Sequence, residues 1–302
     1  MSVIIEPISE GITLVRGKNN GRFPFSHSVL VEKEEGEYVL IDTGCGIDIL
    51  KELKGRYPIT TLINSHTHPD HSAGDWVFSS DSRRLFVPEE GIDTSGSVVK
   101  LSERLAEPGD LATYWQGFVK EAMGFNDYTA TDTYNGDTRF TFDGITLLPI
   151  HTPGHTKDHY CLYEPTKKIL FAFDYDLTGF GPWYGHRESD IGEFILSIDK
   201  LEALDIDVFV SGHKGIITDR IKERLGKYRS IFAKNEEKIL ALLETGVKTI
   251  GGLADASPIY GGFPYAEPLL RYWEGQMIEK HLLQLIEKGG VTKGKNGVYA
   301  LL

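Results

Sequence analysis

The hydrophobic pattern divides the chain into two parts. Over the first 220 residues, short apolar runs alternate with polar turns, which is typical of an α/β fold. Helical spacing predicts helices at residues 47–56 and 194–204. Strands are predicted at residues 3–15, where we expect an edge strand, and at 28–31, 38–41, 59–64, 85–87, 140–150 (paired about a turn at Asp143-Gly144), 160–163, 169–173 and 208–210.

Residues 91–134 interrupt this alternation. The segment has no clear strand signal, and residues 98–105 and 111–123 have helical spacing, so we predict a helical insertion. Five of its aromatic residues lie from Tyr114 to Tyr128. They suit either the wall of an apolar pocket or a helical pair that packs on itself or on a second copy of the chain. Packing of the pair, or a homodimer contact, is the favoured interpretation.

The chain beyond residue 220 is mainly helical. Long helical patterns cover residues 221–244 and 268–288, and residues 291–302 have a hairpin pattern with Asn296-Gly297 at the turn. We therefore expect a catalytic domain at residues 1–220 and a helical C-terminal subdomain at residues 221–302.

Composition narrows the class of protein. A chain of 302 residues can bury its own core. The net charge of −12 argues against a nucleic-acid partner, which needs a basic surface, but it leaves a small-molecule substrate open. Cys45 and Cys161 are too few for a disulfide framework. Residues 1–11 carry no secretory pattern, and no apolar run is long enough for a membrane span, so we expect a cytoplasmic protein without a membrane partner.

The strongest chemical signal is the segment His66-Thr67-His68-Pro69-Asp70-His71. Imidazole and carboxylate groups are good ligands for zinc, iron and manganese. The segment follows a predicted strand and contains a proline, so we expect a loop. Such a loop can direct His66 and His68 to one point while Asp70 and His71 face another.

Three more metal-binding side chains follow apolar strands. His155 comes soon after the strand that ends at residue 150, Asp174 directly follows residues 169–173, and His213 follows residues 208–210. Because α/β folds build their sites on loops at strand ends, these residues are candidate ligands.

This order of motifs resembles the signature of the metallo-β-lactamase superfamily: His-x-His-x-Asp-His, Thr-Pro-Gly-His-Thr, a strand-terminal Asp, and Gly-His. Residues 41–44, Ile-Asp-Thr-Gly, also resemble an earlier motif of that superfamily. The resemblance covers about residues 10–215 and implies an αββα sandwich with a metal site between the sheet edges. The C-terminal subdomain resembles the winged-helix-like appendage of some members, for which a capping or dimerising role suits the acidic chain.

The resemblance also implies a role for each candidate ligand. The first metal ion would be held by His66, His68 and His155, the second by Asp70, His71 and His213, and both by Asp174. Asp42 would orient ligands rather than bind metal. The expected cofactors are two divalent metal ions, with zinc favoured over iron or manganese.

The function implied is hydrolysis of a small ester-like substrate by a metal-bridging hydroxide. Asp70 would also orient the hydroxide and carry a proton to the leaving group. Thr-Pro-Gly-His-Thr is common in glyoxalase II-like members, so a thioester heads the list of substrates, with a lactone next. The alternatives are a small phosphodiesterase, an iron-dependent oxidoreductase and a non-catalytic ligand-binding member of the same fold.

Several residues are weaker candidates. The glycine-rich and aromatic segment at residues 179–187 suggests substrate contacts by Trp183, Tyr184 or His186, although simple packing explains it equally well. Residues 260–265 are a second candidate substrate loop. We expect His159 to pack near the ligands and His281, on the last helix, to face solvent.

Overall fold

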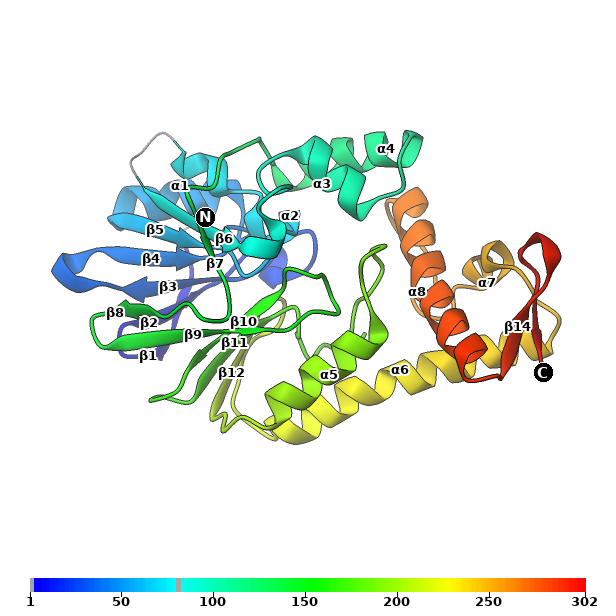
Figure 1. Cartoon of the computed structure of the whole chain (residues 1–302). Helices are drawn as coiled ribbons and strands as arrows, with labels where there is room; N and C mark the ends of the chain where they lie inside the picture. Colours follow the sequence, from blue (N-terminus) through cyan, green and yellow to red (C-terminus); the bar gives the residue numbers. More distant parts are fainter. Residues whose placement is uncertain (1–2, 80–82) are drawn as a thin grey trace.

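The computed structural model describes residues 3–79 and 83–302. Two β-sheets face each other and helices cover their outer surfaces (Figure 1). The chain therefore has the αββα arrangement that the resemblance implied, and the α/β fold class is confirmed.

Parallel pairs within each sheet bring several strand ends to one edge. Strands β4 to β7 run parallel to one another, and so do β11 and β12. The first sheet has the order β1 (Ile5–Ser9), β2 (Ile12–Val15), β3 (Ser28–Glu32), β4 (Tyr38–Ile41), β5 (Ile59–Ile63), β6 (Arg84–Pro88), β7 (Asp132–Tyr134). The second has the order β13 (Gly215–Ile217), β12 (Val208–Ser211), β11 (Ile169–Phe173), β10 (Tyr160–Glu164), β9 (Ile145–His151), β8 (Phe140–Phe142).

The central strands are apolar on both faces. In β11, Phe171 and Phe173 pack between the two sheets, whereas Leu170 and Ala172 pack toward the outer helices. Successive residues of a strand point to opposite faces, so a continuously apolar strand can serve two layers of core. This double burial fixes the position of the strand end, where Asp174 follows.

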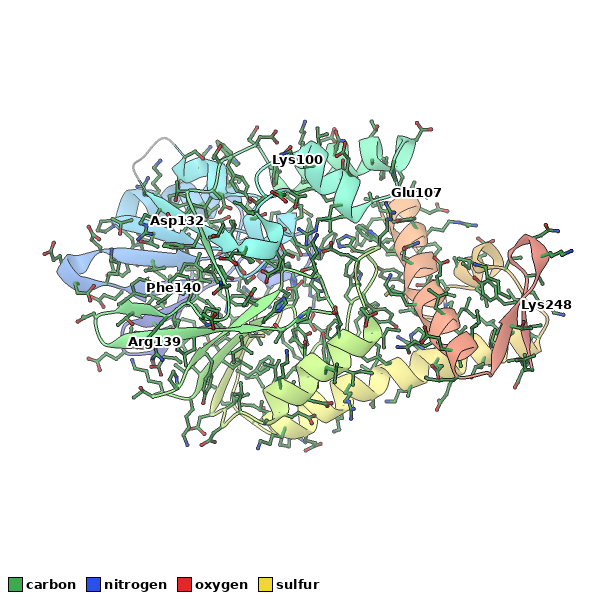
Figure 2. All side chains as sticks on the ribbon, viewed as in Figure 1. Lys100, Glu107, Asp132, Arg139, Phe140 and Lys248 are labelled. Carbon is green, nitrogen blue, oxygen red and sulfur yellow. The ribbon has the colours of Figure 1, made fainter. Side chains whose placement is uncertain are left out.

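Helices form the two outer layers. Helices α1 (Ile47–Arg56), α3 (Val98–Leu105) and α4 (Asp110–Phe118) pack on the first sheet, and a π-helical turn, Val119–Met123, extends α4. Helices α5 (Ile191–Glu202) and α6 (Ile221–Glu244) pack on the second sheet. Charged side chains of the insertion, such as Lys100 and Glu107, lie on its outer surface (Figure 2).

The shortest elements differ from the prediction. The expected edge strand at residues 3–15 is a hairpin of β1 and β2. Residues 132–134, expected inside the helical insertion, form β7 and pair with β6. Strand β13 and helix α7 (Ile250–Ala256) were not predicted. Elements this short present too few positions for a period to show.

The C-terminal segment packs against the rest of the chain. It consists of α6, α7, α8 (Glu267–Glu287) and a hairpin of β14 (Val291–Lys293) and β15 (Tyr299–Leu301). Leu270 and Trp273 of α8 join the apolar cluster of α3 and α4. Among the described helices, none is both long and apolar enough to span a membrane.

The prediction that His281 faces solvent is wrong. Its side chain on α8 is only 1% exposed, and its Nε2 lies 2.8 Å from the Tyr184 hydroxyl. Buried residues occur on several sides of α8, so its spacing did not mark one solvent-facing side.

A buried ion pair connects the helical insertion to the loops that carry Asp158 and Thr67. Arg104 of α3 donates a hydrogen bond of 2.7 Å to Asp158, whose other oxygen accepts from the Thr67 backbone N–H at 3.1 Å. Burial alone would raise the pKa of Asp158, but the Arg104 guanidinium outweighs burial and holds this pKa well below its usual value. Since Thr67 lies between His66 and His68, the ion pair supports the segment that carries both histidines.

Replacing Arg104 with Met should lower the free energy of unfolding by about 3–5 kcal/mol at pH 7, because Asp158 is then buried without its partner. In the native chain the pKa of Asp158 is lower when folded than when unfolded. The pair therefore stabilises the fold above about pH 4 and loses this effect as the pH falls further. Urea unfolding at several pH values measures both effects.

The matched control is Arg84→Met. The Arg84 side chain is 63% exposed in its pair with Asp132, so its loss should cost less than about 1 kcal/mol. Adding Asp158→Asn to Arg104→Met should recover part of the stability. Equal losses in the two arginine variants would show that the buried pair has no special role.

Candidate metal centre

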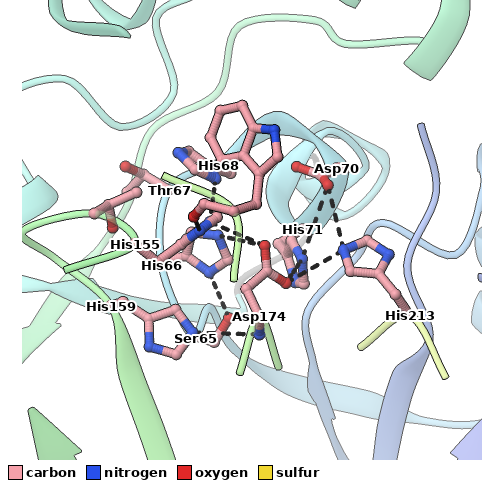
Figure 3. A network of polar contacts seen from close by, with 12 residues as sticks. Ser65, His66, Thr67, His68, Asp70, His71, His155, His159, Asp174 and His213 are labelled. Atoms are coloured by element: carbon pink, nitrogen blue, oxygen red, sulfur yellow. Dashed lines mark hydrogen bonds and ion pairs between the residues drawn. The ribbon is translucent and has the colours of Figure 1, made fainter. Parts of the chain in front are cut away.

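Four strand ends bring the candidate ligands together. The loop after β5 carries His66 and His68, and the loops after β9, β11 and β12 carry His155, Asp174 and His213 (Figure 3). All of them lie at one edge of the sandwich because the strands leading to them end there.

The second half of the His66 to His71 segment is a short helix. Pro69 occupies the first turn of α2 (Pro69–Ser72), and His68 caps its N-terminus in an extended conformation. His66 and His68 therefore precede the helix, while Asp70 and His71 lie within it. This local geometry sends the two pairs of side chains to different points, although part of the expected loop is a helix.

The ligand atoms form two groups that share one carboxylate. The first comprises His66, His68, His155 and Asp174; the second comprises Asp70, His71, Asp174 and His213; and within each group the atoms lie within 4.8 Å of one another.

The two oxygens of Asp174 face different groups. Its Oδ2 lies 2.9 Å from His155 Nε2 and 3.7 Å from His66 Nε2. Its Oδ1 lies 2.7 Å from His71 Nε2 and 3.3 Å from His213 Nε2. Asp174 is thus positioned between two sets of ligands.

The far nitrogen of each imidazole is held by a hydrogen bond. His155 Nδ1 donates to the Trp183 carbonyl at 2.9 Å, and His213 Nδ1 donates to the Gly21 carbonyl at 2.7 Å. A carbonyl only accepts, so in the neutral form each ring carries its proton on Nδ1 and turns the Nε2 lone pair toward the cluster.

Asp42 holds two more rings in the same way. Its carboxylate accepts from His71 Nδ1 at 2.7 Å and from the Ser65 hydroxyl at 2.9 Å. The Ser65 oxygen in turn lies 2.9 Å from His66 Nδ1, from which it can accept. Asp42 therefore contacts the far side of the rings rather than the cluster, and its orienting role stays a prediction.

The fifth ring has an imidazole as its partner. His68 Nε2 lies 2.8 Å from His186 Nδ1, which leaves His68 Nδ1 facing the cluster, 2.9 Å from His155 Nε2. Lys280 of α8 donates to the His186 carbonyl at 2.7 Å. The position of His68 thus depends on a contact that extends to the C-terminal segment.

Backbone conformation at the strand ends is unusual. Asp42 and Phe173 have φ values of 57° and 49°, a region that non-glycine residues seldom occupy. The pairing of β11 with β12 also shifts register between Phe171 and Phe173. Such irregularities redirect the side chain that follows, here Asp174.

Two glycines allow the loops to approach closely. A Cβ on Gly44 would lie 1.5 Å from the Asp70 carbonyl oxygen, so the Ile-Asp-Thr-Gly motif needs glycine there. Gly154 has φ +124°, and a Cβ there would lie 2.3 Å from the Phe194 backbone. Both glycines therefore bring a ligand loop into place.

Charge in the cluster follows from burial and from the shared carboxylate. Burial lowers the pKa values of His66 and His68 well below the usual imidazole value, so both rings are neutral near pH 7. Burial also acts to lower the pKa of His213, but the Asp174 carboxylate outweighs it and raises this pKa to about 9.

Asp174 is an anion in a buried place. Burial alone would raise its pKa, but His71, His213 and His155 outweigh burial and hold it well below its usual value. A buried carboxylate among imidazoles is a suitable ligand set for a divalent cation. The Nε2 atom of His66 is buried and has no hydrogen-bond partner among the described residues, which also fits a metal ligand.

A cavity of about 580 Å³ opens over the cluster. Trp183 and His186 line it, and so do Tyr260 and Tyr265 of the second candidate loop. Tyr184 does not line this cavity, contrary to expectation. It is fully buried and hydrogen bonds to His281 and Asn235.

Other residues near the site had weak or absent sequence signals. His159 packs beside the ligands, and its Nε2 accepts from the Asp174 backbone N–H at 3.4 Å, as predicted for a packing role. Ser65, Phe23 and Trp273 were not predicted. Ser65 adjoins the His66 segment and could have been noticed there, whereas Phe23 and Trp273 lie far from it in sequence.

Comparison with known proteins places this geometry in a family. The profile of the metallo-beta-lactamase superfamily matches residues 21–213. A metallo-beta-lactamase family protein of Thermus thermophilus has the same fold, with a TM-score of 0.76 and 23% identity, over 98% of this chain and 100% of that one.

Two relatives with enzyme names are longer than this chain, which covers only part of each. The linear primary-alkylsulfatase of a Pseudomonas species is 24% identical over 86% of this chain and 54% of its own length. The atrochrysone carboxyl ACP thioesterase AgnL7 of Paecilomyces divaricatus is 24% identical over 70% of this chain and 58% of its own length. This chain thus spans little more than half of each enzyme.

The matched profile covers more than half of the chain and includes every residue of the His/Asp cluster. The chain therefore belongs to the metallo-β-lactamase superfamily and is a metallohydrolase of that superfamily.

Proposed function

We propose that the chain hydrolyses a small ester-like substrate, a thioester or a lactone, at a centre of two divalent metal ions, which we expect to be zinc. The observation that carries this proposal is the position of Asp174, whose two oxygens face two different groups of buried ligands. A single-ion site would need only one of these groups.

We assign the ligands to the two ions as follows. His66, His68 and His155 would hold one ion, Asp70, His71 and His213 the other, and Asp174 both. When bound, a pair of divalent ions makes water a nucleophile at neutral pH and polarises the oxygen of the substrate carbonyl.

The chain's own residues orient the reactants. Asp70 lies on the cavity wall with its Oδ2 3.6 Å from His213 Nε2, where its carboxylate can orient the attacking water. From the same place it can deliver a proton to the leaving group. Asp42 and Ser65 keep the rings of His66 and His71 fixed during this step.

Two lines of support favour an acyl substrate. The thioesterase among the relatives is named for a thioester of an acyl carrier protein. The Thr-Pro-Gly-His-Thr segment, which carries His155, resembles that of glyoxalase II-like members. We also propose a cytoplasmic location, which suits the buried, unpaired thiols of Cys45 and Cys161, and a small molecule rather than nucleic acid as partner. A homodimer stays a prediction.

A panel of substrates tests the reaction class. It contains a thioester, a lactone, a β-lactam and an activated phosphodiester. We expect the highest kcat/KM with the thioester or the lactone, loss of turnover after metal removal by a chelator, and recovery with added zinc. Turnover of the phosphodiester alone would replace the ester proposal with a phosphodiesterase.

Asp174→Ala should abolish metal retention and hydrolysis together, because both groups of ligands lose their shared carboxylate. His68→Ala should have the same result through loss of one ligand. Metal content and turnover, measured on the same samples, check this. Asp137→Ala, at an exposed position, is the control and should behave as the native chain does. Full turnover in either ligand variant would overturn the assignment.

Asp42→Asn should weaken metal binding by about 10–100-fold, because the amide cannot accept from His71 and Ser65 as a carboxylate does. Competition with a chromogenic chelator measures the affinity. Since Asp42 does not line the cavity, zinc in excess should restore most of the turnover. Unchanged affinity would mean that the hydrogen bonds from Asp42 do not position the ligands.

A further inference from the structure

The cavity over the ligand cluster is larger than the reaction itself requires. Its volume of about 580 Å³ lies within the range of sites that bind whole small molecules. Asp70, His155, Asp174 and His213 lie at its surface, so any molecule that fills it contacts the reacting centre.

One wall of the cavity is an apolar stripe of the helical insertion. Trp115, Phe118, Val119 and Met123 all line it. Phe118 follows Trp115 by three residues, and Val119 and Met123 follow it by four and eight, which puts all of them on one face of α4 and the π-helical turn that extends it. Tyr114 precedes Trp115 but does not line the cavity, and its side chain is 44% exposed.

Aromatic rings from other parts of the chain complete the wall. Phe23 stacks on Phe118 with ring centroids 6.0 Å apart, and it forms a T-shaped pair with Trp273 of α8 at a centroid distance of 6.4 Å. The ring centroids of Trp183 and Trp273 lie 5.3 Å apart, and Trp183 Nε1 donates a hydrogen bond of 2.6 Å to the Tyr260 hydroxyl. Contacts among large rings hold this wall rigid, so the cavity exists before a ligand arrives.

Charged groups are confined to another part of the cavity. Apart from the ligand cluster, the charged residues that line it are Arg22, Asp176 and Lys214. Arg22 follows Gly21, whose carbonyl accepts from His213, and Lys214 follows His213 directly. Both cations are exposed. The lining is therefore polar beside His213 and apolar along α4 and α8.

We propose that the apolar wall binds the acyl group of the substrate and that this acyl group is a large apolar one, well beyond acetyl in size. The inference rests on the proposed ester hydrolysis and names the substrate class of that site. Filling a preformed aromatic cavity removes apolar surface from water, whereas an acetyl group would leave most of the wall exposed. The polar leaving group lies toward Arg22 and Lys214.

A series of N-acetylcysteamine thioesters tests the acyl group. The acetyl, hexanoyl and decanoyl compounds share one small leaving group and differ only in apolar length. We expect kcat/KM to rise along the series, by up to about fourfold for each methylene buried. In Phe118→Ala the ratio of decanoyl to acetyl kcat/KM should fall by about tenfold or more, because the stacked ring of the wall is lost.

Tyr114→Ala is the matched control. It removes an aromatic ring from the same helix, outside the cavity, and should keep both the ratio and the basal activity of the native chain. Thermal unfolding of both variants establishes that they are folded. Should Phe118→Ala prove unstable, Phe118→Leu keeps an apolar side chain and should shift the ratio in the same direction by less.

Binding without turnover separates this inference from the proposed reaction. Trp115, Trp183 and Trp273 line the cavity, so tryptophan fluorescence reports its occupation. The probe is the thioether S-decyl-N-acetylcysteamine, which cannot be hydrolysed. We expect saturable binding that weakens about tenfold in Phe118→Ala and not in Tyr114→Ala.

The outcomes differ for the two proposals. Saturable binding of the thioether, without hydrolysis of any thioester or of the lactone in the substrate panel, would overturn the proposed reaction and leave the apolar site standing. Hydrolysis with no preference for acyl length, together with no thioether binding, would overturn the apolar acyl site alone.

Discussion

The structure depends on one buried carboxylate that lies between two groups of imidazoles. Asp174 follows a strand whose side chains are buried on both faces, so the two sheets and their helices fix its place. Its oxygens face different ligand groups, and the surrounding histidines keep it anionic. An anion held in this way calls for a compensating cation, which connects the fold to metal chemistry.

Rigid support extends outward from this carboxylate. Contacts with backbone carbonyls, with Asp42 directly or through Ser65, and with His186 fix the far nitrogens of the histidine rings. Farther out, the Arg104–Asp158 pair ties the insertion to Thr67, and Lys280 ties α8 to the carbonyl of His186. The insertion and the C-terminal segment therefore serve the site twice, since they also supply the apolar wall of the cavity.

Local patterns in the sequence predicted the parts of the structure that local chemistry determines. Helix bounds at residues 47–56 and 221–244 follow from spacing and end signals. The ligand segment at residues 66–71 can be recognised because its metal-binding groups are adjacent in sequence. Contacts between distant segments could not be predicted from such patterns. His281 packs against Tyr184, and Phe23 contacts Trp273, only in the folded chain. The strand at residues 132–134 exists through pairing with β6, which no local period reveals.

The most direct test of the central claim is element-resolved metal content, measured on protein purified without added metal or chelator. Two ligand groups that share Asp174 predict about two divalent ions per chain, and we expect these ions to be zinc. A site that stays empty, and that takes up no divalent ion when zinc is offered, would contradict the account, because the buried anion would then have to be balanced by protonated histidines alone.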